Sequence, residues 1–99
     1  METMQLTKYG DGGPGFYTWH ADTGLRGSTG KRRLSVTVQL SAGDAYAGGD
    51  FQLLLGPEGA RNMTRQAGYL VAFPSTTYHQ VAPVTAGTRY SLVAWFEVP

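Results

Sequence analysis

The chain has 99 residues, a formal net charge of +1, 15% charged residues and no cysteine. This length predicts one domain with a single modest core, and the charge, with no basic stripe or acidic run, gives no indication of a nucleic-acid or membrane partner. The lack of cysteine excludes disulfides and thiolate metal sites and is typical of a reducing compartment.

The start of the chain carries no targeting signal that we can identify. Residues 1–4 lack the charged and apolar regions of a signal peptide, and no apolar run approaches the roughly 18 residues of a membrane span. We therefore expect a cytoplasmic protein.

Short apolar runs separated by turn residues indicate many short strands and little helix. Fourteen glycines and five prolines punctuate runs rich in Val, Leu, Thr, Tyr and Phe. Residues 41–49 are predicted to form a hairpin-like connection, and residues 56–67 a loop with one short strand. The other predicted strands cover residues 3–9, 16–21, 33–40, 50–55, 68–73, 77–82 and 88–98. Seven to eight short strands predict an all-β fold, a jelly roll or double-stranded β-helix.

Two of these strands carry one polar and one apolar face, because successive strand side chains point to opposite sides. The polar faces hold Ser35, Thr37, Gln39, Arg89 and Ser91, with Val93 and Trp95 on the same face as Arg89. The apolar faces hold Leu34, Val36, Val38, Leu40, Tyr90, Leu92, Ala94, Phe96 and Val98. We expect the polar faces to line the interior, so that the apolar outer faces need a cover. The alternative is an apolar interior with a polar exterior.

The stretch around residue 20 pairs an imidazole with a carboxylate. His20 and Asp22 lie two residues apart in a predicted strand and so point the same way, where both can bind one metal ion. Taken alone, this pair is more often structural. His79 is the only other histidine, and two histidines with one carboxylate form the facial triad that holds non-haem iron with open coordination positions.

The ordered motifs of the chain are specific when taken together. They are Tyr17-X-X-His20-X-Asp22, Phe73-Pro74-Ser75 leading to His79, and Gly87-X-Arg89-X-Ser91, supported by residues 33–41, 48–50 and 83–95. In this order they resemble the Fe(II)/2-oxoglutarate-dependent oxygenase superfamily, and within it the prolyl-4-hydroxylase-like group of PKHD-type hydroxylases. The resemblance runs from Tyr9 to Trp95 and implies that residues 1–99 form a single dioxygenase core domain without the usual N-terminal helical region.

The resemblance implies roles for individual residues. His20, Asp22 and His79 are the expected Fe(II) ligands. Arg89 is expected to bind the distal carboxylate of 2-oxoglutarate, since its planar fork fits a carboxylate bidentately; the collagen-type prolyl hydroxylases have lysine here. Ser91 can add a hydroxyl donor to the same carboxylate.

Further residues are expected near the cosubstrate or in the core. Tyr17 lies three residues before His20, on the opposite face of an ideal strand, and needs a twist or bulge to reach the cosubstrate. Gln39 is a candidate polar group at the carboxylate end. Four aromatic residues are assigned to packing: Trp19, Phe51, Phe73 and Trp95.

The implied activity is hydroxylation of an amino-acid or prolyl side chain, or of another small molecule, coupled to decarboxylation of 2-oxoglutarate to succinate. The expected cofactors are Fe(II) and 2-oxoglutarate, with ascorbate as a possible addition, and the substrate is a small molecule or a peptide. Residues 10–15 are expected to form a loop beside the site, and residues 23–32 a loop that closes over the substrate. The apolar outer face indicates either a truncated core or a homodimer.

Two other interpretations remain open. A cupin would need a His-X-His cluster and a nearby glutamate, whereas this chain has His-X-Asp. A non-catalytic jelly-roll binding or structural module would retain the metal-site residues without turnover.

Overall fold

The computed structural model describes residues 4–10, 15–23 and 31–97. Within these residues nearly all regular structure is strand, with one short 3-10 helix at Gly56–Glu58. The strands are β1 (Gln5–Gly10), β2 (Tyr17–His20), β3 (Arg32–Gln39), β4 (Tyr46–Gly48), β5 (Phe51–Leu54), β6 (Ala60–Asn62), β7 (Leu70–Pro74), β8 (His79–Val81) and β9 (Val84–Glu97). In this part of the chain no helix is long and apolar enough to cross a membrane.

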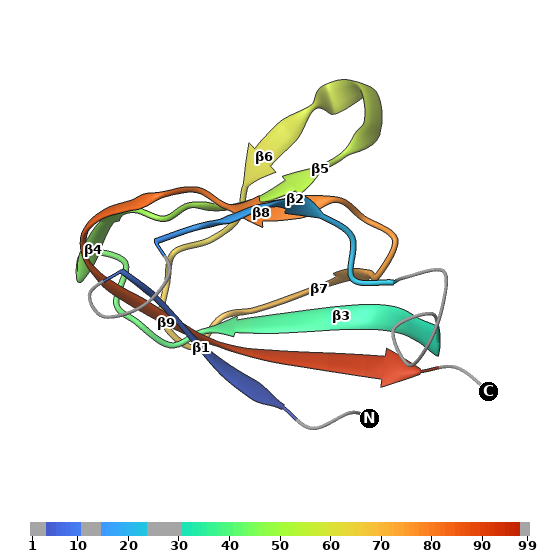
Figure 1. Cartoon of the computed structure of the whole chain (residues 1–99), viewed down its shortest axis with the longest axis horizontal. Coiled ribbons are helices and arrows are strands. Elements are labelled where there is room, and N and C mark those ends of the chain that lie inside the picture. Colours follow the sequence, from blue (N-terminus) through green and yellow to red (C-terminus); the bar gives the residue numbers. More distant parts are fainter. Residues whose placement is uncertain (1–3, 11–14, 24–30, 98–99) are drawn as a thin grey trace.

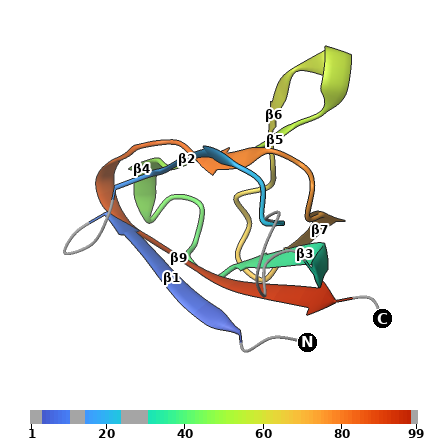
Figure 2. The ribbon, with the colours of Figure 1, turned by 45° about the vertical axis from the view of Figure 1, so that its right-hand side comes forward.

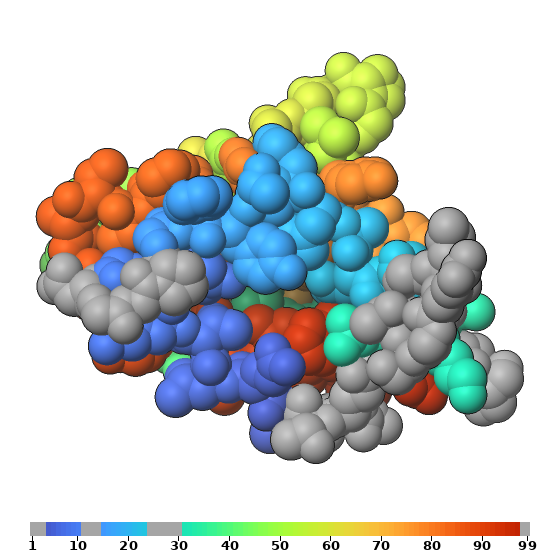
Figure 3. Space-filling model, viewed as in Figure 1, coloured from blue at the N-terminus to red at the C-terminus, as the bar shows by residue number. Residues whose placement is uncertain are grey.

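The strands form two antiparallel sheets that face each other. The major sheet has the order β1-β9-β3-β7, with β4 paired to β9, and the minor sheet has the order β2-β8-β5-β6. Figure 1 shows the minor sheet above the major sheet, and the turned view in Figure 2 shows the same two layers. Figure 3 shows β2 on the near face, above β1 and β9. This arrangement confirms the predicted jelly roll.

The largest departure from the predicted elements is at the start of the last strand. β9 begins at Val84, not at residue 88, and its first residues pair with β4, which lies in the segment predicted as a connection. Gly87 permits this pairing because it takes φ +72° opposite Tyr46. β6 lies where one short strand was predicted. Of the two predicted loops, residues 11–14 and 24–30 lie outside the described residues.

The predicted inward face of the major sheet is confirmed. Ser35, Thr37 and Gln39 of β3 are buried, as are Arg89 and Ser91 of β9. The two strands pair in register along this face, with Gln39 opposite Ser91. The polar side chains therefore face the space between the sheets.

The outer face of the major sheet is correspondingly apolar and accessible. Its exposed large side chains come from all four main strands: Leu6, Leu34, Leu70, Tyr90 and Phe96. Leu6 of β1 and Leu92 of β9 are cross-strand partners, so the apolar surface continues from strand to strand.

The core lies between the sheets. Tyr9, Phe51, Leu53, Phe73 and Val81 form a buried cluster, and the rings of Phe51 and Phe73 lie 5.8 Å apart, as their assignment to packing predicts. Trp95 is also buried. The packing assignment of Trp19 was wrong, because this residue is 36% exposed: it neighbours the inward-pointing His20 and so points outward from β2.

Candidate active site

The two histidines are brought together by neighbouring strands of the minor sheet. His20 ends β2, His79 begins β8, and the two are cross-strand partners. Their ring atoms Nδ1 lie 2.7 and 2.9 Å from the backbone carbonyl oxygens of Thr18 and Thr77. Because a carbonyl only accepts, each Nδ1 carries the hydrogen, which leaves each Nε2 lone pair directed away from the strand.

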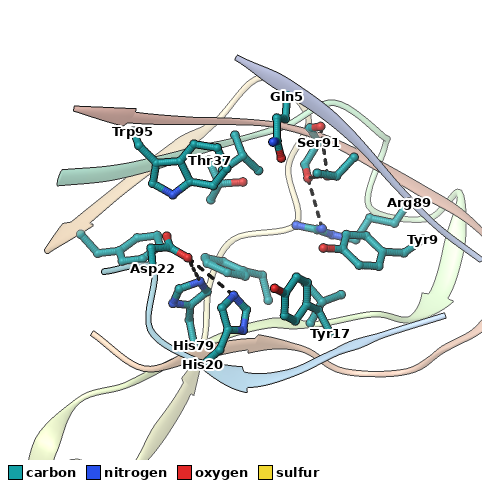
Figure 4. Close-up of a pocket in the computed structure, with 15 residues that line it drawn as sticks. Gln5, Tyr9, Tyr17, His20, Asp22, Thr37, His79, Arg89, Ser91 and Trp95 are labelled. Carbon is teal, nitrogen blue, oxygen red and sulfur yellow. Dashed lines mark hydrogen bonds and ion pairs between the residues drawn. The ribbon is translucent and has the colours of Figure 1, made fainter. Parts of the chain in front are cut away.

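The carboxylate of Asp22 meets these lone pairs. Asp22 lies after the end of β2 and not within the strand that was expected to carry both His20 and Asp22. Its backbone N–H donates instead to the carbonyl of Ser75 at 2.9 Å. Its Oδ1 lies 3.1 Å from His79 Nε2 and 3.6 Å from His20 Nε2. Figure 4 shows the three side chains converging at one end of the cavity, as the spacing in the sequence predicted.

These residues fit a divalent metal ion. One ligand atom from each of His20, Asp22 and His79 lies within 4.8 Å of the others. Ligands bonded at about 2.1 Å and at right angles lie about 3 Å apart, close to the shorter Nε2–Oδ1 distance. Two imidazole lone pairs and an anionic oxygen that face one another need a cation between them, a proton in the metal-free chain or a metal ion, and two imidazoles with one carboxylate suit Fe(II).

The electrostatics favour the deprotonated ligand set. Burial lowers the pKa of His20 below its usual 6.5, and the nearby His79 lowers it further, although the hydrogen bond to Thr18 and the Asp22 charge oppose the shift. Burial alone would raise the pKa of Asp22, but in the metal-free chain a hydrogen on His79 Nε2, which a bound metal ion would replace, and the hydrogen bond from Ser35 outweigh burial and lower the pKa to about 2. Asp22 is therefore ionised at neutral pH.

Arg89 places a buried cation in the same cavity. It is 3% exposed, its Nε atom has no hydrogen-bond partner, and no carboxylate among the described residues pairs with its guanidinium. Its charged group lies 5.8 Å from the Tyr9 ring centroid and 6.0 Å from that of Phe51. Since a buried charge is costly unless paired, this guanidinium is suited to bind an anionic ligand.

Hydroxyl groups lie beside Arg89. The Ser91 hydroxyl oxygen is 3.5 Å from Arg89 Nη1 and forms a short hydrogen bond with the Thr7 hydroxyl. Thr7 and Tyr9 of β1 were not predicted as site residues, although both line the cavity. The alternation in Gln5-X-Thr7-X-Tyr9, with polar residues on one face as in β3, was the signal that could have identified them.

Tyr17 reaches the His20–Asp22–His79 cluster because β2 has the irregularity that the position of Tyr17 requires. The pairing of β2 with β8 shifts register between Tyr17 and His20. The Tyr17 ring consequently stacks on the His20 imidazole, with centroids 3.8 Å apart and planes at 22°. Tyr17 therefore lines the cavity, while half of its surface remains exposed.

Gln39 is not brought to the cavity with the other predicted residues. Its amide nitrogen donates to the Tyr46 hydroxyl at 2.9 Å and to the Ser41 carbonyl at 3.1 Å, and it is absent from the lining. These contacts tie β3 to the β4 segment. In contrast, Trp95, assigned only to packing, lines both the inner cavity and its mouth.

The cavity lies between the sheets and opens at one side. Its inner part contains the two histidines and Asp22 at one end and Arg89 and Ser91 at the other. A wider mouth of about 380 Å³ shares His20, Asp22 and Trp95 with the inner part and adds Arg32. The arrangement can hold a metal ion and an anionic cosubstrate inside while a larger molecule approaches through the mouth.

Comparison with known protein families identifies the superfamily of this chain. The sequence model of the 2OG-Fe(II) oxygenase superfamily matches residues 4–97. The chain belongs to this superfamily. Its match includes every predicted site residue, and the jelly roll described above is consistent with it.

Individual relatives support a position near the hydroxylases of the superfamily. The chain is 40% identical, over 82% of its length and 36% of the relative's, to a PKHD-type hydroxylase of Synechococcus sp. (strain CC9605). It resembles the crystal structure of a Pseudomonas putida prolyl-4-hydroxylase with TM-score 0.78 and 27% identity, over 97% of this chain and 52% of that one.

A third solved structure has the same fold. It is a Trichoplax adhaerens prolyl hydroxylase in complex with a hypoxia inducible factor oxygen degradation domain peptide fragment, with TM-score 0.77 and 22% identity over 95% of this chain and 42% of that one. The chain spans only about two-fifths of the length of the curated relatives that it matches.

Proposed function

We propose that this chain is a 2-oxoglutarate-dependent Fe(II) dioxygenase that hydroxylates its substrate. The observation that carries the proposal is the pairing, in one cavity, of the His20–Asp22–His79 cluster with the buried guanidinium of Arg89. A metal site alone would fit many enzymes. A metal site facing a buried, unpaired cation calls for a ligand that is both a metal chelator and a carboxylate, as 2-oxoglutarate is.

The residues of the cavity have separate roles in the proposed reaction. His20, Asp22 and His79 would hold Fe(II), which when bound supplies the oxygen activation that couples decarboxylation of 2-oxoglutarate to hydroxylation. Arg89, with Ser91 beside it, binds the distal carboxylate and so fixes how far the 2-oxo acid extends toward the histidines. Tyr17 covers the outer face of His20, and Phe51 and Phe73 keep water from the inner wall.

The proposed substrate is an amino-acid or prolyl side chain, free or within a peptide. Two observations support this class: the names of the hydroxylases that the chain resembles and the accessible mouth beside His20, Asp22 and Trp95. We place the reaction in the cytoplasm, with ascorbate as an optional reductant that keeps the iron in its ferrous state.

Succinate production tests this function. Purified chain with Fe(II), 2-oxoglutarate, oxygen and a panel of prolyl peptides and free amino acids should form more succinate than the His79→Ala variant does. Folded protein could instead bind metal and 2-oxoglutarate but form no more succinate than His79→Ala with any panel member. That result would contradict the proposed enzymatic activity and favour the non-catalytic module.

We also propose that a second copy covers the apolar outer face of the major sheet. Leu6 and Leu70, which are 65% and 59% exposed on β1 and β7, extend the patch to both edges of that sheet, and exposed apolar surface of this kind marks interfaces. Sedimentation should show a dimer that Leu6→Lys with Leu70→Lys dissociates. Wild-type monomer at high micromolar concentration would contradict this assembly.

A further inference from the structure

The proposed function gives no role to Ser75 of the Phe73-Pro74-Ser75 motif. Ser75 is 1% exposed and Ser35, on β3, is 0% exposed, so both hydroxyl groups lie entirely inside the protein. Buried hydroxyls are kept where they make hydrogen bonds, because an unpaired one costs free energy. Ser35 bonds to the carboxylate of Asp22, and Ser75 bonds to Ser35.

The hydroxyls form a chain that ends on Asp22. Ser35 Oγ donates to Asp22 Oδ2 at 2.6 Å, and Ser35 Oγ lies 2.9 Å from Ser75 Oγ. An ionised carboxylate only accepts and a hydroxyl has one hydrogen, so the hydrogen of Ser35 is directed to Asp22. Ser75 must therefore be the donor to Ser35, and the chain runs from Ser75 through Ser35 to Asp22.

The backbone of Ser75 holds the same three segments together. Its carbonyl accepts the N–H groups of Asp22 and Thr23 at 2.9 and 3.2 Å, and its own N–H donates to the Arg33 carbonyl at 3.0 Å. Asp22 lies beyond the end of β2 and so has no sheet ladder to fix it. Its main chain and its carboxylate are instead fixed by Ser75, which follows β7, and by Ser35 of β3.

The geometry points to Ser35 and Ser75 as positioning residues of the carboxylate ligand, an inference that rests on the proposed function. Because Oδ2 is held by Ser35, only Oδ1 faces the Nε2 atoms of His20 and His79. The carboxylate is thus restricted to one metal-binding oxygen, which leaves the positions that a chelating cosubstrate and oxygen require. Ser75 acts on Asp22 through Ser35.

Titration of the full chain with Co(II), followed by its visible absorption, tests this role without turnover. We expect Ser35→Ala to weaken Co(II) binding by about 10–100-fold, the usual effect of losing a hydrogen bond to a metal ligand, and Ser75→Ala to weaken it less. Because Ser75 acts through Ser35, adding Ser75→Ala to Ser35→Ala should cause no further loss of affinity. The Co(II) band should also change shape in Ser35→Ala as the carboxylate gains freedom to bind through both oxygens.

Control variants separate positioning from general destabilisation. Ser41→Ala removes a serine hydroxyl away from the cavity, which accepts a hydrogen bond from the Tyr90 N–H. This variant should leave Co(II) affinity unchanged. Ser35→Thr retains the hydroxyl and should restore most of the affinity lost in Ser35→Ala. Metal-free thermal unfolding identifies any variant that fails to fold, in which case Ser75→Ala carries the test.

The outcomes distinguish the two proposals. Wild-type Co(II) affinity in folded Ser35→Ala and Ser75→Ala, or additive losses in the double variant, would overturn the positioning role and leave the metal site intact. A folded wild-type chain that binds no Co(II) would overturn the metal site itself, and the positioning role with it.

Discussion

His20 and His79 face each other across β2 and β8, with ring centroids 4.2 Å apart. Each ring bonds through Nδ1 to a carbonyl two residues earlier in the chain. The minor sheet therefore sets the separation, tautomer and direction of both imidazoles before any metal arrives. Because both imidazoles are already in place in the metal-free chain, removing one side chain of the site should lower metal affinity directly. Metal binding should not require the site to fold first.

Removal of one imidazole should abolish tight metal binding. His79→Ala takes away the proposed ligand whose Nε2 lies 3.1 Å from Asp22 Oδ1, so we expect at least about a 100-fold loss of Mn(II) affinity, more than loss of an outer hydrogen bond causes. Calorimetric titration measures this. Tyr78→Ala, at the exposed neighbouring position, is the matched control and should bind like wild type; equal affinity of His79→Ala would exclude His79 as a ligand.

The charge and the planar shape of the Arg89 guanidinium should contribute separately to 2-oxoglutarate binding. Arg89→Lys keeps a cation but loses the planar fork, so 2-oxoglutarate should bind at least about 10-fold more weakly to the Mn(II)-loaded protein. Mn(II) affinity itself should not change, since Arg89 is not among the clustered ligands. Arg61→Lys, at a well-exposed site, serves as the control. A 2-oxoglutarate affinity that survives Arg89→Lys unchanged would argue against bidentate recognition.

The stability of the metal-free chain should fall in acid partly through Asp22. Its pKa is lowered from 3.8 to about 2 in the folded protein, so its stabilisation is present above about pH 4 and is lost as the pH falls toward 2. The full shift corresponds to about 2 kcal/mol of unfolding free energy. Urea unfolding of wild type and Asp22→Asn between pH 6 and 2 isolates this contribution. Parallel curves for the two proteins would show that Asp22 is not stabilised by the fold.

Gly87 of the Gly87-X-Arg89-X-Ser91 motif should be required for stability because of its backbone conformation and its lack of a side chain. A Cβ at Gly87 would lie 2.3 Å from the Ala45 carbonyl oxygen, at φ +72°. Gly87→Ala should therefore lose more than about 2 kcal/mol of unfolding free energy. Gly68 has φ +84°, but a Cβ added there would meet no atom within 4 Å, so Gly68→Ala should cost clearly less. Equal losses in urea unfolding would mean that backbone conformation, not contact with the β4 segment, dominates.

The sequence predicted the site better than it predicted the elements that surround it. Strand alternation divided the side chains of β3 and β9 between two faces, and placing Arg89 inside selected the inward face, because a period of two assigns every side chain once one residue is placed. The need for an irregularity between Tyr17 and His20 followed from the same rule. Asp22 lies beyond the end of β2, so its position depends on Ser75 and not on strand alternation.

The missed features are those that depend on contacts between distant segments. β4 has three residues, and its pairing with β9 places Tyr46 opposite Gly87, which has a positive φ. Ser35 and Ser75 lie 40 residues apart, and nothing local marks their hydroxyls as neighbours of Asp22. Gln39 shares its face with Ser35 and Thr37 but turns to Tyr46, a partner that β4 supplies.

Anaerobic titration of the purified chain with Fe(II) and 2-oxoglutarate tests the central claim most directly. We predict a weak visible charge-transfer band in wild type that is absent from His79→Ala and needs far more 2-oxoglutarate in Arg89→Ala. No band at any concentration, from protein shown to be folded, would contradict the claim that the chain binds iron and 2-oxoglutarate together.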